Sequence, residues 1–403
     1  MATDLSLAIG QRSMGNPDIA YPLWPPLTAG CPTTSTDEIA YPVEVDYDYD
    51  RVPPGLFQHA TGTGLDRWAP LLPPLTAPGL AEGGTPLVEI ADGAFVKDEA
   101  RNPTWSHKDR LNRCTVSAAL GAGADGIVVA SSGNHGASAA AYATRAGLKC
   151  VVLTSAETPP AVTSFLRAYG AVVLTVPTEA RWPLLRRIVA ETGFHPVSNV
   201  TTTHTGHAFG PEGYKTIAYE IFIELGVPAA VFAPTGYGEL LFGVWKGFAE
   251  LVRLGVATTT PRMFACEPAA GGPLAHSLTE GRPAAEVEVA QTAAYAINSK
   301  VSGYRPVAAI QASDGRALLV DDAEMARAQH DLTRAGLWYE MSAAAGLAGF
   351  RQVRDQEEFD GPVVCIATSS GFKDIGVGAG RPEPTDPHWD VVRRHLRSSG
   401  IAC

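Results

Sequence analysis

Asn102-Pro103-Thr104-Trp105-Ser106-His107-Lys108-Asp109-Arg110 places one lysine directly after a turn, at the start of a predicted helix. Pro103 keeps Asn102 out of helical angles. Ser106 and Asp109 have capping-box spacing, with Asp in place of the usual Glu or Gln, so a helix is expected from Ser106. Lys108 then lies in the first helical turn, where unpaired N–H groups and the helix dipole favour the free amine that a Schiff base requires. The alternative is a solvated lysine that opens a surface helix.

The composition indicates a soluble globular enzyme. The 403 residues are too many for one small core and suggest two domains. Apolar residues make up 45% of the chain and charged residues 18%. The net charge of −11 argues against a nucleic-acid-binding protein and against a partner at an anionic membrane. The N-terminus does not have the pattern of a signal peptide, and no run of about 18 apolar residues offers a membrane span.

The six cysteines are scattered and lack the paired spacing of a metal site, so no metal is expected and a reduced, cytoplasmic setting fits best. Four of them lie in apolar or helical surroundings and are expected to be small core residues: Cys114, Cys150, Cys266 and Cys365.

Residues 1–80 are rich in Pro, Gly and Tyr and are expected to form an extended N-terminal arm. The acidic and aromatic run at 46–50 is predicted to be a solvated edge strand rather than a metal site. The Pro-rich piece at 70–78 is predicted to be an extended connector.

From residue 94 onward, predicted strands and helices alternate. A strand at 94–97 enters the lysine turn, and the helix that follows is expected to end near residue 120. The β-branched strand at 126–130, the Gly-containing turn at 131–136 and the helix at 137–145 predict a right-handed βαβ unit. Further strands are expected at 149–154, 172–175, 229–233, 263–267 and 363–367, and helices at 162–169, 181–192, 213–225, 240–254, 323–335 and 342–352. We therefore expect an α/β protein with two open twisted sheets flanked by helices.

Three polar turns directly follow apolar strands: Ser131-Ser132-Gly133-Asn134, Thr235-Gly236-Tyr237-Gly238 and Thr368-Ser369-Ser370-Gly371. In an open parallel sheet such turns gather at one edge. Each alone could be a strand-to-helix turn that needs Gly for a positive φ. Together they can present backbone N–H groups to an anion, and the lysine adds an amine. A phosphorylated aldehyde cofactor fits that combination.

At this point the chain resembles the threonine synthase family, within the tryptophan synthase β-like pyridoxal-phosphate enzymes of fold type II. The matching blocks, in family order, lie at 82–87, 102–110, 131–136, 212–216, 234–238, 243–247 and 368–374. The resemblance implies that fold and pyridoxal 5'-phosphate as cofactor. It is less specific for the substrate, a small amino acid.

The resemblance also implies roles for single residues. Lys108 would bind the cofactor aldehyde and later move the proton at Cα, and Asn134 would hydrogen-bond the phenolate oxygen of the cofactor. The cofactor phosphate would be wrapped by Thr235, Gly236, Tyr237, Gly238 and Glu239. The substrate carboxylate would be held by Ser131, Ser132, Gly133 and His135, and Thr104 and Ser106 are further candidates for substrate contact. Thr368 would face the pyridine nitrogen and leave it largely unprotonated, which favours elimination and replacement over transamination. Ser342 matches a position near the cofactor.

Four positions depart from the family pattern. Glu239 and Leu240 stand where a further Gly and Asn are usual, and a carboxylate beside a phosphate is unfavourable unless it points away or is neutralised. Trp105 replaces the common Gly of the lysine turn, and His107 the common Phe.

We therefore expect a pyridoxal-phosphate-dependent lyase with threonine-synthase-like elimination or replacement at Cβ or Cγ. The alternative is a serine or threonine dehydratase, or a β-replacement synthase of the cysteate or cysteine synthase kind. A cofactor-free binding protein that kept the fold is a third hypothesis. Residues 81–125 and 213–403 are expected to form a large domain, residues 126–212 a smaller mobile one, and the family resemblance implies a homodimer.

Overall fold

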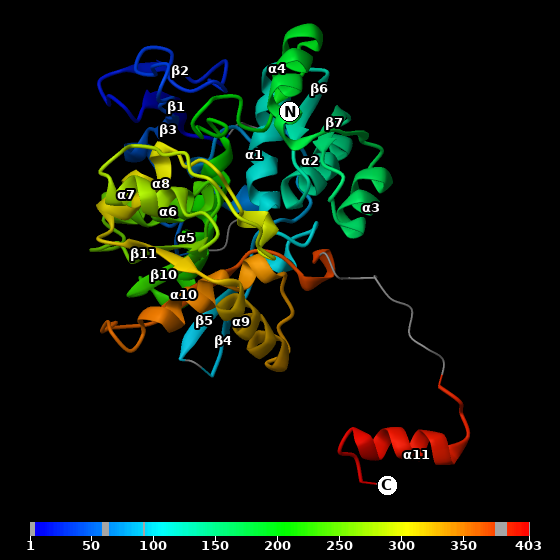
Figure 1. Cartoon of the computed structure of the whole chain (residues 1–403). Helices are drawn as coiled ribbons and strands as arrows, with labels where there is room; N and C mark the ends of the chain where they lie inside the picture. Colours follow the sequence, from blue (N-terminus) through cyan, green and yellow to red (C-terminus); the bar gives the residue numbers. More distant parts are fainter. Residues whose placement is uncertain (1–4, 59–63, 92, 375–384, 403) are drawn as a thin grey trace.

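The computed structural model describes residues 5–58, 64–91, 93–374 and 385–402 (Figure 1). Its largest sheet has six strands in the order β12-β11-β10-β13-β5-β4, all parallel except for the β4–β5 pair. The second has four parallel strands in the order β8-β7-β6-β9. The expected α/β class with two helix-flanked sheets is confirmed.

The strands of the large sheet are β4 (Leu87–Glu89), β5 (Ala94–Asp98), β10 (Ala230–Pro234), β11 (Arg262–Pro268), β12 (Arg316–Val320) and β13 (Val363–Ala367). Those of the four-stranded sheet are β6 (Gly126–Ala130), β7 (Lys149–Thr154), β8 (Val172–Thr175) and β9 (His195–Pro196). The helices are α1 (Lys108–Gly121), α2 (Asn134–Arg145), α3 (Pro160–Ala168), α4 (Arg181–Thr192), α5 (Gly210–Leu225), α6 (Glu239–Arg253), α7 (Pro273–Thr279), α8 (Tyr304–Ala312), α9 (Asp322–Arg334), α10 (Ala345–Val353) and α11 (Trp389–Ser398). Short 3-10 turns are η1 (Tyr49–Arg51), η2 (Gly64–Leu71), η3 (Glu99–Arg101), η4 (Thr178–Ala180), η5 (Tyr295–Ile297), η6 (Met341–Ala344) and η7 (Gly371–Lys373).

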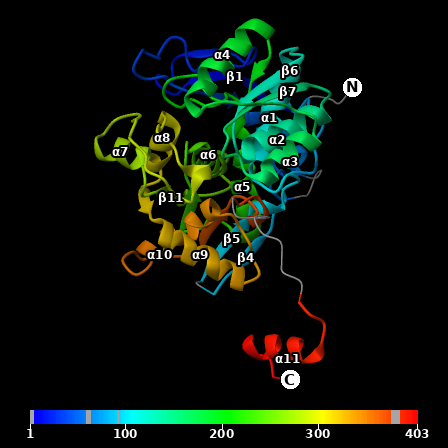
Figure 2. The ribbon, with the colours of Figure 1, turned by 45° about the vertical axis from the view of Figure 1, so that its right-hand side comes forward.

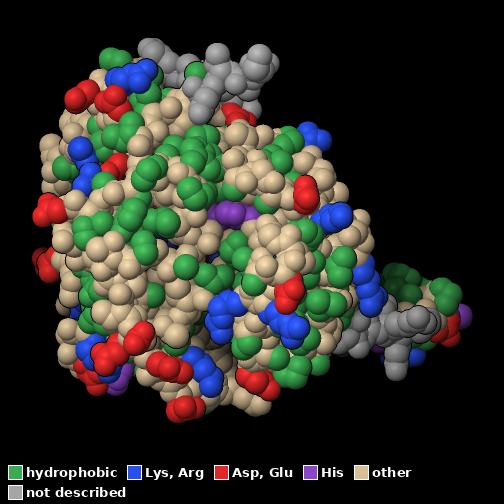
Figure 3. Space-filling view, turned by 90° about the horizontal axis from the view of Figure 1, so that it is seen from above, with side chains coloured by type: hydrophobic (Ala, Val, Ile, Leu, Met, Phe, Trp, Pro, Cys, Tyr) green, Lys and Arg blue, Asp and Glu red, His purple; other side chains and the backbone are tan. Residues whose placement is uncertain are grey.

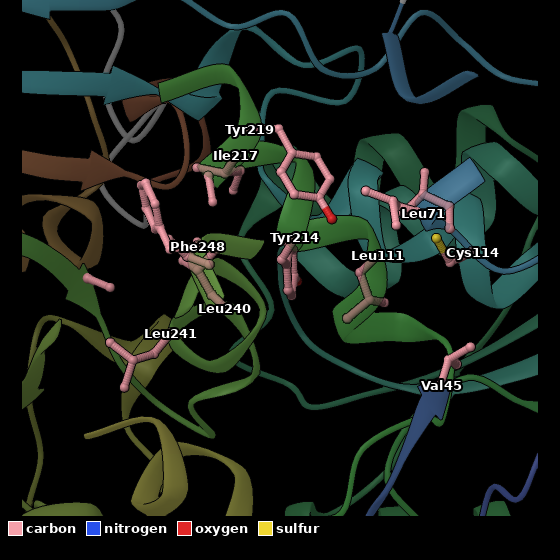
Figure 4. Packing of buried hydrophobic residues seen from close by; sticks show 14 of the residues in the cluster. Val45, Leu71, Leu111, Cys114, Tyr214, Ile217, Tyr219, Leu240, Leu241 and Phe248 are labelled. Carbon is pink, nitrogen blue, oxygen red and sulfur yellow. The ribbon is translucent and has the colours of Figure 1, made fainter. Parts of the chain in front are cut away.

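Helices α1, α5 and α6 form the layer between the two sheets. In Figure 2, α1, α2 and α3 lie beside β6 and β7, whereas α10 packs on β10, β11, β12 and β13 of the large sheet and α9 packs on α10. Two glycines allow the middle helices to approach closely. A Cβ at Gly213 of α5 would collide with the backbone of Arg110 in α1, and a Cβ at Gly247 of α6 would meet the Lys215 carbonyl at 2.6 Å. Figure 4 shows the apolar core that results, with Tyr214, Ile217 and Phe248 among its residues.

The N-terminal arm is a small antiparallel sheet of β2 (Ala20–Pro22), β1 (Ala8–Ser13) and β3 (Val43–Tyr47). Its third strand alternates buried and half-buried residues, with Val43, Val45 and Tyr47 turned inward. Tyr47 belongs to the same apolar core as α5 and α6. Asp46, in the acidic run, pairs with Arg12 at 2.6 Å. The described residues contain no group of three or more His, Cys, Asp or Glu placed to hold a metal.

The predicted capping box at the start of α1 is wrong. The helix begins at Lys108, and His107 is its N-cap residue without a side-chain cap. The reason is that the Asp109 carboxylate accepts hydrogen bonds from Thr104 instead, from its backbone N–H at 2.7 Å and from its hydroxyl at 2.5 Å. Lys108 is nevertheless in the first helical turn, as predicted.

Other boundaries shift, and some elements were not expected. Helix α2 starts at Asn134, three residues before the predicted start, so that Asn134 and His135 belong to the helix. The predicted helix at 342–352 is the short η6 turn followed by α10. Helices α7, α8 and α11 and strand β12 were not predicted. No helix among the described residues is long and apolar enough to span a membrane. Cys114, Cys150, Cys266 and Cys365 are buried, as expected.

Candidate active site

A cavity of about 470 Å³ lies between the two main sheets, at the carboxyl ends of their strands. Its wall includes the turn after β6, the turn after β10, Thr368 after β13 and Lys108 at the start of α1. Figure 3 shows one face of the molecule, in which charged side chains lie mainly towards the edges and a histidine lies near the middle. The strand order therefore brings the three polar turns and the lysine to one place.

Lys108 is held by aromatic neighbours. Its Nζ donates to the Tyr214 hydroxyl at 3.1 Å, and the His107 ring stacks on Tyr214 with 5.4 Å between ring centroids. His107 also ties the lysine turn to the end of β13, because its N–H donates to the Thr368 carbonyl at 3.0 Å. Burial lowers the pKa of Lys108, against the opposing fields of Glu239 and Glu340. The direction favours the free amine, as predicted from the sequence, but burial is the main cause.

The turn after β6 is organised by its own hydroxyl groups. The Ser131 hydroxyl accepts from the N–H groups of Gly133, at 3.2 Å, and Gly136, at 3.0 Å, and so shapes the start of α2. The Ser132 hydroxyl donates to Ser155 at 3.0 Å and accepts from Arg181 at 3.2 Å. Ser131, Ser132, Gly133, Asn134 and His135 all line the cavity.

Asn134 lies at the centre of a buried polar cluster. Its side-chain nitrogen donates to Glu340 at 3.0 Å. Its side-chain oxygen accepts from Ser369 at 3.0 Å and from Lys373 at 2.9 Å. The orientation of the Asn134 amide is therefore fixed from both ends. Burial raises the pKa of Glu340 to about 7, partly offset by Lys373.

The turn between β10 and α6 has the geometry of an anion cradle. Gly238 has a φ of +77°, and a Cβ there would overlap the Pro306 ring. The turn leads directly into the N-terminus of α6, whose first N–H groups have no partner within the helix. Gly236, Tyr237, Gly238 and Glu239 line the cavity.

Glu239, one of the departures from the family pattern, lies beside the His204 ring and the Arg305 guanidinium. Its carboxylate lies 3.4 Å from His204 Nε2 and 3.7 Å from Arg305 Nη1. Burial acts to raise the pKa of Glu239, but His204 and Arg305 hold it at about 2. A Cβ at Gly206 would overlap this carboxylate, so the glycine makes room for it. His204 is also stacked on Tyr237, with 4.1 Å between ring centroids.

Some predicted residues do not reach the cavity wall. Thr104 and Ser106 are buried beside the lysine turn, where Thr104 binds Asp109 and the Ser106 hydroxyl has no hydrogen-bond partner. The Thr235 side chain donates to the Ala233 carbonyl at 2.8 Å. Ser342 accepts from the Ala296 N–H at 3.2 Å. None of these four is part of the cavity wall, so this placement does not support a side-chain contact with substrate or cofactor.

Other residues of the wall were not predicted from the sequence. They include Ser155, Arg181, Asn199, His204, His207 and Glu340. His204 and His207 lie in the loop between β9 and α5, which has no periodic pattern to reveal it. Glu340 follows β12 and α9, and only its position in the block matched around Ser342 could have indicated it.

The wall fits a phosphorylated pyridine aldehyde. Several of its buried polar atoms have no hydrogen-bond partner: His135 Nε2, His204 Nδ1 and Glu340 Oε2. Unpaired buried polar atoms are costly, so they indicate a place for a polar ligand. The amine of Lys108 and the glycine turn before α6 supply partners for an aldehyde and a phosphate.

An α/β fold in which a half-buried lysine and a glycine-lined turn before a helix line one cavity is typical of the pyridoxal-phosphate enzymes of fold type II. The profile of the family "Pyridoxal-phosphate dependent enzyme" matches residues 79–369. The chain belongs to this family, and within it to the threonine synthase family of lyases.

Relatives and structures support that assignment. Threonine synthase from Mycobacterium bovis is 32% identical over 380 residues, covering 88% of this chain and 96% of that protein. Threonine synthase from Methanosarcina acetivorans is 31% identical over 395 residues, covering 90% and 96%. Maize serine racemase has a TM-score of 0.62 at 19% identity, covering 78% of this chain and 93% of that one. The processed form of threonine deaminase isoform 2 from Solanum lycopersicum has a TM-score of 0.61 at 22% identity, covering 71% and 79%. The two structures show the fold alone.

Proposed function

We propose that this enzyme eliminates or replaces a group at Cβ or Cγ of a small amino acid that carries an O-phosphate, as a threonine synthase does. The observation that carries the proposal is a cationic corner in the wall that Lys108 also lines. Arg181 reaches it from the start of α4 and donates to Ser132, which in turn contacts Ser155. A guanidinium with two hydroxyl groups suits a phosphate leaving group.

The residues of the cavity divide the work between them. Bound pyridoxal phosphate supplies an electron sink for the α carbon. Lys108, with its lowered pKa, is placed to take and return the α proton. The substrate carboxylate would bind at the start of α2, where Ser131 and His135 line the cavity and helix N–H groups favour an anion. Thr368 offers a hydroxyl rather than a carboxylate on the β13 side of the cavity.

One observation favours the second candidate, dehydration of serine or threonine or β-replacement on an uncharged substrate. Glu157 lines the same cavity as Arg181, and its carboxylate acts on the Arg181 guanidinium. A carboxylate in that corner repels a phosphate dianion and partly neutralises the arginine. Free hydroxyamino acids or their acetyl esters avoid that repulsion.

The test is a substrate panel of O-phosphohomoserine, O-phosphoserine, O-acetylserine, serine and threonine, with phosphate release and keto-acid formation as readouts. The proposal expects the phosphorylated substrates to have the highest kcat/KM. Arg181→Met should lower kcat/KM for them by about tenfold or more and leave serine nearly unaffected. If free serine or threonine ranks first and Arg181→Met does not change the order, the second candidate replaces the first.

The role of Lys108 is tested separately. Borohydride reduction of the holoenzyme should attach the cofactor to Lys108, as mapped by peptide mass spectrometry. Lys108→Ala should lower turnover by about a hundred- to ten-thousandfold, because both the covalent site and the proton carrier are lost. A label on another side chain, or full turnover by the Ala variant, would contradict the proposal.

We further propose the division into a mobile unit at 126–212, a large domain at 81–125 and 213–403, and an N-terminal extension at 1–80. The four-stranded sheet lies wholly within the first range, which supports the division. A cytoplasmic homodimer, expected from the family resemblance, belongs to the same proposal. Light scattering of the purified protein at several concentrations tests the dimer.

A further inference from the structure

Trp105 occupies a backbone conformation that large residues rarely adopt. Its φ is +63°, and among the described residues only Ala81 and Asp314 share a positive φ without being glycine. The conformation is held by two hydrogen bonds to the Trp105 carbonyl, from Ser370 N–H at 3.1 Å and from the Ser369 hydroxyl at 3.2 Å. A tryptophan at a position that a glycine would fill without strain indicates that the ring itself is used.

The Trp105 ring reaches across to the four-stranded part of the molecule. Its edge packs against Phe165 of α3 with 5.4 Å between centroids and an interplanar angle of 86°. On its other side it contacts Phe372, at 5.7 Å. Helix α3 also packs on α2, on β8 and on the η7 turn that carries Phe372 and Lys373. The aromatic contact therefore joins α3 to the turn that carries Lys108.

Lys373 extends this link to the cavity. Its Nζ lies 5.1 Å from the centroid of the Phe165 ring, a cation–π geometry. The same Nζ donates to the Thr104 carbonyl and, at 2.9 Å, to the side-chain oxygen of Asn134. Phe165 thus contacts both Trp105 and the ammonium group of Lys373, and Lys373 in turn holds the side chain of Asn134.

We propose that Trp105, Phe165 and Lys373, which we name the aromatic bridge, couple the position of α3 to the lysine turn and to Asn134. In this arrangement Trp105 is a positioning residue: it does not line the cavity, and it acts through the elements on either side of it. Because Phe165 belongs to α3, its contacts with Trp105 and Lys373 connect this helix to the lysine turn and, through the Lys373 hydrogen bond, to Asn134 at the start of α2. The proposal rests on the proposed function only for the roles of Lys108 and Asn134.

The first experiment uses the full chain without cofactor. Hydrogen exchange of α3 is compared in the wild type, Trp105→Gly, Trp105→Phe, Phe165→Ala and the Trp105→Gly/Phe165→Ala double variant. We expect Trp105→Gly and Phe165→Ala each to speed exchange in α3 about two- to tenfold, as expected for the loss of one aromatic pair. The double variant should be no faster than the faster single one, and Trp105→Phe should restore slow exchange.

Asp314→Gly is the matched control, because it relieves a positive φ far along the chain in the loop before β12. It should leave α3 exchange unchanged. Trp105→Gly removes backbone strain as well as the ring. Its thermal unfolding midpoint is therefore measured too: faster α3 exchange at an unchanged midpoint indicates loss of coupling, whereas a lowered midpoint indicates general destabilisation. Phe165 is only half-buried, and its Ala variant is expected to fold.

In the holoenzyme, Trp105→Gly should raise KM for the amino acid more than it lowers kcat, since the carboxylate-binding turn is displaced while Lys108 remains. Unchanged α3 exchange in both single variants, or additive effects in the double variant, would overturn the bridge. Changed exchange with no turnover of any amino acid would leave the bridge standing and reject the proposed function instead.

Discussion

Two buried polar regions of this molecule differ in how completely their groups are paired. Around Arg110 every donor is used: it binds Glu99 at 2.7 Å, Glu220 at 2.6 Å and the Thr216 hydroxyl at 2.7 Å. In the cavity, by contrast, His135 and Glu340 each keep a buried polar atom without a partner. The first region is a finished scaffold under α1, and the second is complete only with a ligand.

The two regions also shift the pKa values of their carboxyl groups in opposite directions. Burial acts to raise the pKa of both Glu220 and Glu340. Arg110 and Lys97 overcome that effect and lower the pKa of Glu220, whereas Glu340 reaches about 7. A buried glutamate is therefore a fixed anion in the scaffold, as Glu220 is, but a group that titrates near neutral pH at the cavity, as Glu340 does.

Removing the scaffold cation should have the largest effect on stability. Arg110→Met leaves the buried carboxylates of Glu99 and Glu220 without their shared partner and should cost about 3–5 kcal/mol of unfolding free energy. Denaturant unfolding measures it. Arg101→Ala is the control, because that side chain is 68% exposed and pairs with Asp98 at 2.9 Å, so it should cost about 1 kcal/mol or less. Equal losses in the two variants would contradict the contrast.

Acid should lower the free energy of unfolding by protonating the carboxylates that are paired with buried cations. Glu212 binds Lys215 at 2.7 Å and Lys246 at 2.8 Å, which lower its pKa from 4.5 to about 2 against the effect of burial. Its contribution, about 3 kcal/mol, is therefore present above pH 4.5 and is lost as pH falls towards 2. Unfolding measured across this range should show a steep acid limb in the wild type. Glu212→Gln should flatten it, and an unchanged limb would disprove the assignment.

Glu340 should give the opposite pH dependence. Its pKa is raised from 4.5 to about 7, so its contribution is present below pH 4.5 and is lost as pH rises through 7. Glu340→Gln should remove about 1–3 kcal/mol of this dependence in the protein without cofactor. Unfolding at a series of pH values from 4 to 8 tests it, with Glu224→Gln on the exposed face of α5 as the control. A slope that persists in Glu340→Gln assigns the titration to another group.

The smallest effect is expected on cofactor affinity, at the turn between β10 and α6. Glu239→Gln removes the carboxylate beside Arg305, so that the charge of the guanidinium favours the cofactor phosphate more strongly. We expect the Kd for pyridoxal phosphate to fall about two- to tenfold, with a stronger dependence on salt, because a more positive site is screened more by added ions. Titration of the apoprotein measures this change, with Glu224→Gln as a charge-matched control. A weaker affinity would show that Glu239 organises the cradle instead of opposing the phosphate.

Local sequence patterns predicted the parallel strands well. The strands at 126–130, 149–154, 172–175 and 363–367 are found at their predicted residues, because each is a short run rich in apolar, β-branched residues, whether the strand is buried like β13 or largely exposed like β8. Strand β12 was not predicted, although Ala317–Val320 is an apolar run, because a run this short fits a helix as well as a strand. The capping box failed because Thr104 competes for Asp109, a contact that spacing alone does not reveal.

The cavity was predicted in part. Residues in turns directly after strands were found, because strand order alone places them. The partners of Glu239 and of Ser132 were not, because Arg305 and Arg181 come from α8 and α4, far away in the sequence. Such pairings depend on how helices pack, which local patterns do not encode.

Strand β3 bears on how this chain is made. Arg305 donates to the Val43 carbonyl across 262 residues, and Lys246 to the Val45 carbonyl across 201. During synthesis the N-terminal strand emerges first, but its partners are not available until most of the protein has left the ribosome. Until then an apolar edge stays uncovered, so slow translation or a holding chaperone should affect the yield of soluble protein more than a change at the C-terminal helix.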